Sequence, residues 1–152
     1  MAVLALTGCE GGAGTAAAGP ARFATVLQVT DGDTIRVRLE TGGVERVRYI
    51  GIDTPETNGP VECYGPEATA ANARMVGGRV RLEFDVERRD RYGRLLAYVH
   101  ADGRMVNAAL ARGGYAEPLT IEPNVRHERR FRALAREARR AGRGMWRVCR
   151  GG

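Results

Sequence analysis

The chain has 152 residues, 43% of them hydrophobic and 28% charged, which fits one globular domain with a sizeable core. The formal net charge is +6, and all 24 basic residues are arginine. A basic domain attracts polyanions, and arginine favours bidentate contacts with phosphate, but charge alone does not identify a nucleic-acid partner. No apolar stretch reaches the length that a transmembrane helix needs, so the sequence predicts none.

Residues 1–21 differ in composition from the rest of the chain. Residues 11–20 are mostly small and offer no core-forming face, a composition typical of a linker. The segment Leu6-Thr7-Gly8-Cys9 before them resembles the lipobox of bacterial lipoproteins, in which Cys9 would be lipidated. Only eight residues precede Cys9, without a basic region, so either the start codon is placed too late or the match is chance. We interpret residues 1–21 as a truncated signal or lipobox-like segment with a linker, and expect a secreted or lipid-anchored bacterial protein.

From residue 22 onward, apolar residues alternate with charged ones, which is typical of half-buried strands. Ile35, Val37 and Leu39 show the alternation clearly, and Thr41-Gly42-Gly43 predicts a hairpin turn after them. The predicted strands cover residues 23–29, 35–40, 44–52, 79–84 and 95–100.

Three segments have the apolar period of a helix: residues 66–76, 105–112 and 125–141. Pro66 suits a first turn, and Gly142 is a plausible C-cap of the last helix. We interpret the arginines of that last helix as a solvated face, and a nucleic-acid surface there is the less favoured alternative. The pattern predicts a mainly β fold with helices (α+β), namely a five-stranded OB-fold barrel with about three helices. The predicted domain spans residues 22–148, followed by a tail at 149–152.

Asp33 follows the first predicted strand and Asp53 the third, so a closed sheet could bring the two carboxylates together. Hard cations such as Ca²⁺ or Mg²⁺ bind oxygen ligands of this kind. Each segment taken alone is ambiguous, since Asp-Gly-Asp is also an ordinary turn and an Asp or Thr before Pro55 commonly opens a turn.

Two arginines accompany these carboxylates. Arg48 lies within an apolar strand, where an unpaired guanidinium is costly, so it needs a structural carboxylate or a substrate phosphate as partner. Arg94 follows a Tyr-Gly turn and could equally be an ordinary surface residue.

The combination of five motifs, in order, is similar to the staphylococcal nuclease (thermonuclease) family. The motifs lie at residues 31–34, 48–56, 64–68, 90–94 and 101–107, and the resemblance runs from about Val26 to Trp146. It implies an OB-fold barrel, Ca²⁺-dependent cleavage of DNA and RNA that leaves 3′-phosphate ends, single-stranded or flexible substrates, and a monomer.

The resemblance also implies roles for individual residues. Asp33 and Asp53 match the Ca²⁺ carboxylates, and Thr54 matches a carbonyl ligand. Glu56 matches the residue that activates or orients the attacking water. The other matched residues are the phosphate-gripping pair Arg48 and Arg94, Asp31 just outside the metal ligands, and Tyr92 near a nucleotide phosphate.

One segment departs from the family pattern. Two tyrosines that contact the base in the best-known member are absent here, where residues 119–122 read Leu-Thr-Ile-Glu. We therefore expect affinity or base preference to differ from that member, while the phosphate chemistry is retained. Tyr115 lies nearby in sequence, but the sequence does not place it as a substitute for these tyrosines.

The three cysteines have no zinc-site spacing. We expect a disulfide between Cys63 and Cys149, which would suit an exported protein, with two free thiols as the alternative. Two rival functions remain open: an OB-fold nucleic-acid-binding module without catalysis, and a structural or protein-interaction barrel. The intact set of five site residues favours the nuclease.

Overall fold

A five-stranded barrel forms the body of the molecule in this computed structural model, which describes residues 22–149. Its strands run in the order β3-β2-β1-β5-β6, and a parallel pairing of β3 with β6 closes the sheet. The other barrel pairings are antiparallel. The strands are β1 (Arg22–Val29), β2 (Thr34–Leu39), β3 (Val44–Tyr49), β4 (Ile52–Asp53), β5 (Arg79–Glu83), β6 (Leu95–Ala101), β7 (Arg104–Met105) and β8 (Glu117–Pro118). The predicted OB-fold barrel is confirmed.

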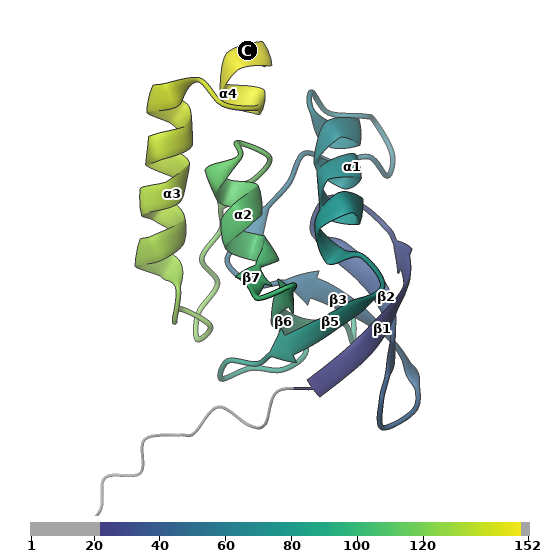
Figure 1. The fold of residues 1–152 in the computed structure, drawn as a ribbon. Coiled ribbons are helices and arrows are strands. Elements are labelled where there is room, and N and C mark those ends of the chain that lie inside the picture. Colours follow the sequence, from purple (N-terminus) through teal and green to yellow (C-terminus); the bar gives the residue numbers. More distant parts are fainter. Residues whose placement is uncertain (1–21, 150–152) are drawn as a thin grey trace, which may run out of the picture.

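Helices lie together at one end of the barrel, with α2 between α1 and α3 (Figure 1). They are α1 (Gly65–Val76), α2 (Val106–Arg112), α3 (Glu128–Ala141) and α4 (Met145–Val148). The short helix α4 and the two-residue strands β4, β7 and β8 were not predicted, because segments this short carry no measurable period. Among residues 22–149, no helix has the length and apolar character needed to cross a bilayer.

The core fills the barrel and the space between the barrel and the helices. Alternation along β2 buries Ile35, Val37 and Leu39 and leaves the arginines between them exposed. The apolar stripe of α3 closes the core from the helical side with Phe131, Leu134 and neighbouring alanines. Binary patterning therefore determines which face of each element points inward.

The predicted strand over residues 44–52 is wrong in one respect, because the chain turns sharply after Tyr49. Gly51 has a φ of 80°, and a Cβ atom added there would lie 2.5 Å from the Phe131 ring. Only glycine accepts both conditions. The strand consequently breaks into β3, which stays in the barrel sheet, and β4, which pairs with β8 instead.

Helix α3 begins at Glu128, later than the predicted residue 125, because the preceding backbone has other partners. The Arg126 N–H donates to Asp85 Oδ2 at 3.1 Å, and the Val125 N–H donates to the Pro123 carbonyl at 3.1 Å. At the other end Gly142 takes the left-handed conformation at φ 61°, as the predicted C-cap requires.

A disulfide joins Cys63, in the loop before α1, to Cys149 after α4, with 5.9 Å between the Cα atoms. It spans 86 positions in sequence, so the pairing that we expected is present in the structure. Cys149 also donates its N–H to the Met145 carbonyl at 2.8 Å. The segment that we had interpreted as a tail is therefore fixed to the fold at its first residue.

Reduction of this disulfide should lower the free energy of unfolding by about 4 kcal/mol, since the chain-entropy model gives roughly 4 to 5 kcal/mol for a loop of this length. Cys63 is exposed and accessible to reductant. Urea unfolding of oxidised protein, reduced protein and the Cys63→Ser/Cys149→Ser variant measures the effect. Equal midpoints for all three would contradict the prediction.

A polar cluster on the barrel surface surrounds Glu83 of β5. Its carboxylate pairs with His100 Nε2 at 2.8 Å, Arg126 Nη1 at 3.0 Å and His127 Nε2 at 3.3 Å. Burial alone raises the pKa of Glu83, but hydrogen bonds from these three partners outweigh it and lower the pKa below its ordinary value. The ionised carboxylate therefore stabilises the folded chain by connecting β5, β6 and the start of α3.

Glu83→Gln should lower the free energy of unfolding at pH 7 by about 2 kcal/mol, the order expected for charge-assisted hydrogen bonds. A carboxyl with a lowered pKa in the folded state contributes stability above its unfolded pKa and loses it as pH falls through the folded pKa. The gap between wild type and variant in urea unfolding should therefore narrow below about pH 4.5. A gap independent of pH would refute this account.

Candidate active site

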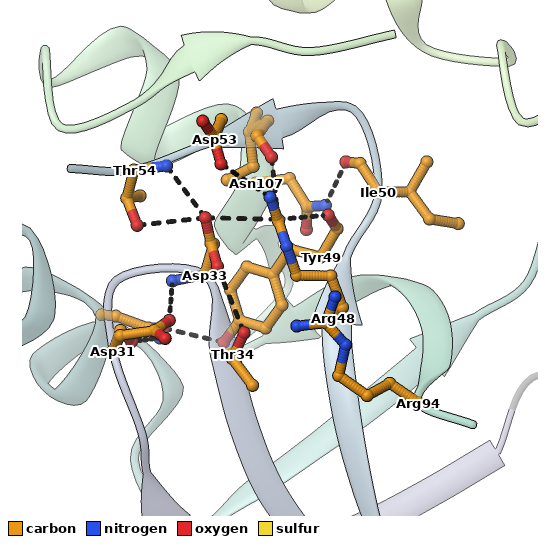
Figure 2. A network of polar contacts seen from close by, with 12 residues as sticks. Asp31, Asp33, Thr34, Arg48, Tyr49, Ile50, Asp53, Thr54, Arg94 and Asn107 are labelled. Atoms are coloured by element: carbon orange, nitrogen blue, oxygen red, sulfur yellow. Dashed lines mark hydrogen bonds and ion pairs between the residues drawn. The ribbon is translucent and has the colours of Figure 1, made fainter. Parts of the chain in front are cut away.

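Asp33, Arg48 and Asp53 meet where the turn after β1 approaches the break between β3 and β4 (Figure 2). Asp33 is buried, and its Oδ2 accepts hydrogen bonds from the backbone N–H of Thr54 at 2.8 Å and from the Thr54 hydroxyl at 3.1 Å. Asp31 supports it from the same turn by accepting the Asp33 N–H at 3.0 Å. The structure thus brings together two carboxylates that are 20 positions apart in sequence.

Arg48 joins the two carboxylates. Its Nη1 lies 3.2 Å from Asp33 Oδ2, and its Nη2 donates to Asp53 Oδ1 at 2.8 Å. The same Nη1 donates to the carbonyls of Tyr49 at 2.9 Å and Ile52 at 2.8 Å, which holds the turn between β3 and β4. From the sequence we expected Arg48 to pair with either a structural carboxylate or a substrate phosphate. In the structure its anionic partners are the carboxylates of Asp33 and Asp53. The guanidinium is consequently fixed in place before any ligand binds.

Two fully buried asparagines hold this region against the helices. Asn72 of α1 accepts the Tyr49 hydroxyl at 2.7 Å and donates to the Asp31 carbonyl at 2.9 Å. Asn107 of α2 donates to the Ile50 carbonyl at 2.8 Å and accepts the Val99 N–H at 2.9 Å. Sequence reasoning assigned neither a role. A polar residue on the inner face of a predicted helix is the signal that could have found them, because buried amides need partners.

Glu56 lies in the loop between β4 and α1, where its side chain is exposed. Its N–H donates to Glu62 Oε2 at 2.9 Å, and the Glu62 N–H donates back to the Glu56 carbonyl at 2.9 Å. Glu62 precedes Cys63, so the disulfide is attached next to this pair. Sequence reasoning missed Glu62, and no local pattern identifies it. Glu56 takes part in both bonds through its main chain, which leaves its carboxylate free to act.

Arg94 lies just before β6, and its Nε donates to Asp90 Oδ2 at 2.7 Å. Asp90 also accepts the backbone N–H groups of Arg94 and Tyr92, both at 3.0 Å, which fixes the turn around Tyr92. Arg94 is therefore a half-buried side chain with a fixed orientation. The sequence alone had left open the alternative that Arg94 is an ordinary surface residue. The parallel pairing of β3 with β6 places it beside the strand that carries Arg48.

Arg48 and Arg94 line one cavity of about 450 Å³. Tyr92 is on its lining and has an exposed ring that Arg91 and Arg94 approach at 4.8 and 5.4 Å from the centroid. Leu119 and Ile121 belong to residues 119–122, the segment that departs from the family pattern. Both are exposed apolar residues that line the same cavity. The cavity is thus a largely apolar hollow with three guanidinium groups on its lining, those of Arg48, Arg91 and Arg94.

Tyr115 does not substitute for the missing tyrosines. Its ring stacks on Tyr64 at the start of α1, with 5.6 Å between centroids. Instead, Asn124 reaches the cavity and holds its rim, since it accepts the Glu87 N–H and donates to the Glu87 carbonyl, both at 2.8 Å.

Carboxylates accumulate negative charge around Asp33. Burial, followed by the charge of Asp33, raises the pKa of Asp31 to about 6. Burial also raises the pKa of Asp53 and of Glu56, and in both cases the charge of Asp33 adds to the effect. Such an excess of like charge is relieved by a bound cation.

The donor set fits a hard divalent cation. Asp33, Asp53 and the Thr54 carbonyl offer only oxygen, the ligand type that Ca²⁺ prefers. In residues 22–149, however, no three His, Cys, Asp or Glu side chains are grouped closely enough to form a ready-made metal site. Arg48 instead provides the positive charge that both aspartates share.

The fold and the site define an OB-barrel protein in which oriented guanidinium groups meet carboxylates at the edge of an apolar cavity. The family model described as "Staphylococcal nuclease homologue" matches residues 46–148. The chain belongs to the staphylococcal nuclease family.

Three relatives illustrate the similarity. The chain is 40% identical over 125 residues to the thermonuclease of Staphylococcus hyicus, covering 80% of this chain and 73% of the relative. It is 42% identical over 128 residues to the SPbeta prophage-derived endonuclease YokF of Bacillus subtilis (strain 168), and 41% identical to endonuclease YncB of the same strain. Each match covers 80% of this chain but spans 43% of YokF and 60% of YncB.

Proposed function

We propose that this protein is a Ca²⁺-dependent nuclease that hydrolyses phosphodiester bonds of DNA and RNA and leaves 3′-phosphate ends. The observation that carries the proposal is the pair of fixed guanidinium groups, Arg48 and Arg94, on one cavity beside the carboxylates Asp33 and Asp53. The names of the relatives, endonuclease and thermonuclease, support it.

The residues of the site suit attack of water on a phosphodiester. The water oxygen bonds to phosphorus, the bond from phosphorus to the 5′ oxygen breaks, and the leaving oxygen takes up a proton from solvent. Glu56 accepts the proton of the attacking water, and its raised pKa makes it a better base than an ordinary glutamate. Arg48 and Arg94 stabilise the negative charge that builds on the phosphoryl oxygens, at little cost because both are already oriented.

Asp33, Asp53 and the Thr54 carbonyl are the groups that would hold Ca²⁺. When bound, the ion supplies additional positive charge for the phosphoryl oxygens. Binding also neutralises part of the repulsion among the carboxylates near Asp33.

Incubation of the purified protein with single-stranded DNA or RNA, with Ca²⁺ or with chelator, tests the proposal. We expect cleavage with Ca²⁺, none with chelator, and recovery when Ca²⁺ is added back in excess. Treatment of the products with a 3′-phosphatase should change their electrophoretic mobility. Binding without cleavage under every condition would instead support the nucleic-acid-binding module, and neither binding nor cleavage the structural barrel.

We also propose that the protein acts as a monomer outside the cytoplasm, either secreted or lipid-anchored. The disulfide between Cys63 and Cys149 supports this location, because such bonds persist in oxidising compartments. The lipidation prediction at Cys9 concerns a residue outside those that the structure describes.

A further inference from the structure

A second hollow, with a volume of about 390 Å³, lies between β8 and α3. Three arginines of α3 line it: Arg132, Arg136 and Arg139. The remaining lining residues are Ala135 and the two residues of β8, Glu117 and Pro118. We call this feature the α3 groove. Its lining has three guanidinium groups against one carboxylate, so it attracts anions.

The α3 groove is connected to the candidate active site through a single short strand. In the pairing of β4 with β8, Asp53 lies opposite Glu117, and Ile52 lies opposite Pro118. Those two residues of β8 also form one wall of the groove. A polynucleotide that leaves the site at Asp53 and crosses β8 therefore arrives at the arginines of α3.

The helix presents its arginines to the groove as a set. Positions 132, 136 and 139 follow the spacing that aligns side chains along one face of a helix, and all three are exposed. Arg132 pairs with Glu128 at 2.9 Å, while Arg136 and Arg139 form no ion pair within the described part of the chain. The Arg139 Cζ atom lies 4.2 Å from the centroid of the Trp146 ring. The ring covers one face of the Arg139 guanidinium and leaves the N–H donors at the edge of the guanidinium available.

We propose that the α3 groove binds backbone phosphates of the same polynucleotide that is cut at the site, on the segment that flanks the scissile bond. This inference rests on the proposed function. Polynucleotide is the occupant that fits, because the groove is positively charged and adjoins a site lined by phosphate-binding arginines. It favours the alternative of a nucleic-acid surface on this helix over a solvated face alone.

The test variant is Arg132→Gln/Arg136→Gln/Arg139→Gln, since glutamine keeps helix propensity while removing the charge. For a 20-nucleotide single-stranded DNA, kcat/KM should fall about tenfold, whereas cleavage of a dinucleotide, too short to reach the groove, should change far less. Binding of the 20-nucleotide strand is measured in the presence of chelator, as the slope of log affinity against log salt concentration. This negative slope should become shallower by about 2, because each phosphate that an arginine neutralises contributes roughly 0.7 to its magnitude.

A matched control removes the same charge elsewhere: Arg74→Gln/Arg79→Gln/Arg104→Gln. These positions are exposed and line neither the cavity nor the groove. Arg79 is ion-paired with Glu40, as Arg132 is with Glu128, so the two variants lose comparable surface pairs. We expect the control to keep kcat/KM and the salt slope near wild type, and thermal unfolding should establish that both variants fold.

Equal losses in the two variants would assign the effect to net charge and overturn the proposal. Equal losses on the dinucleotide and the 20-nucleotide strand would also overturn it, as would no loss at all. If the wild-type protein binds DNA without cutting it, the proposed function fails but the salt slopes still decide whether the groove binds phosphate.

Discussion

Arg94→Ala should lower the turnover number on single-stranded DNA by about 10²- to 10³-fold, the range seen when one fixed donor to a developing oxyanion is removed. Arg94 is on the wall of the 450 Å³ cavity and is oriented by Asp90 at 2.7 Å. The free energy of unfolding should fall by no more than about 1 kcal/mol, because partly exposed ion pairs contribute little. Single-turnover kinetics with Ca²⁺ and urea unfolding measure the two effects.

Arg89→Ala is the matched control for this variant. Arg89 lies in the same turn region and pairs with Glu45 at 2.8 and 3.0 Å, yet it does not line the cavity. The control should keep the wild-type turnover number. If both variants lose activity equally, the effect of Arg94 comes from the turn that it stabilises and not from contact with phosphate.

Glu56→Gln should lower the turnover number by about 10²- to 10⁴-fold, the usual contribution of a general base. The substitution keeps side-chain size, and the contacts that fix this loop are made by the Glu56 main chain, so the fold should be unchanged. Rapid-quench measurement of the cleavage step tests the prediction. The part of the acidic limb of the pH–rate profile that reflects Glu56 should also disappear, because protonation at this position no longer limits the rate.

Glu67→Gln provides the comparison for Glu56→Gln, since Glu67 is exposed on the first turn of α1 and its side chain forms no hydrogen bond or ion pair among residues 22–149. It should retain wild-type kinetics. Wild-type turnover in Glu56→Gln itself would remove this residue from the mechanism and leave water activation to another group.

Local pattern was sufficient for most of the architecture. Alternation at Ile35, Val37 and Leu39 and the stripe around Phe131 and Leu134 identified the buried faces, because burial of apolar surface follows the period of each element. The ordered motifs identified the family, and with it the residues that the structure gathers at Arg48. The break at Gly51 was missed, because the Phe131 ring that requires glycine there comes from a distant helix.

The sequence by itself determined the barrel, the family and the chemical types of the site residues, because these depend on local periodicity and on motif order. Only the tertiary structure decided that Arg48 is shared by Asp33 and Asp53, that Tyr115 stacks on Tyr64, and that β8 connects the site to α3. Such contacts join positions far apart along the chain: the amide of Asn107 and the carbonyl of Ile50, for example, are 57 residues apart. Closure of the barrel through β3 and β6 sets which of these distant groups meet, and no window of local sequence contains that information.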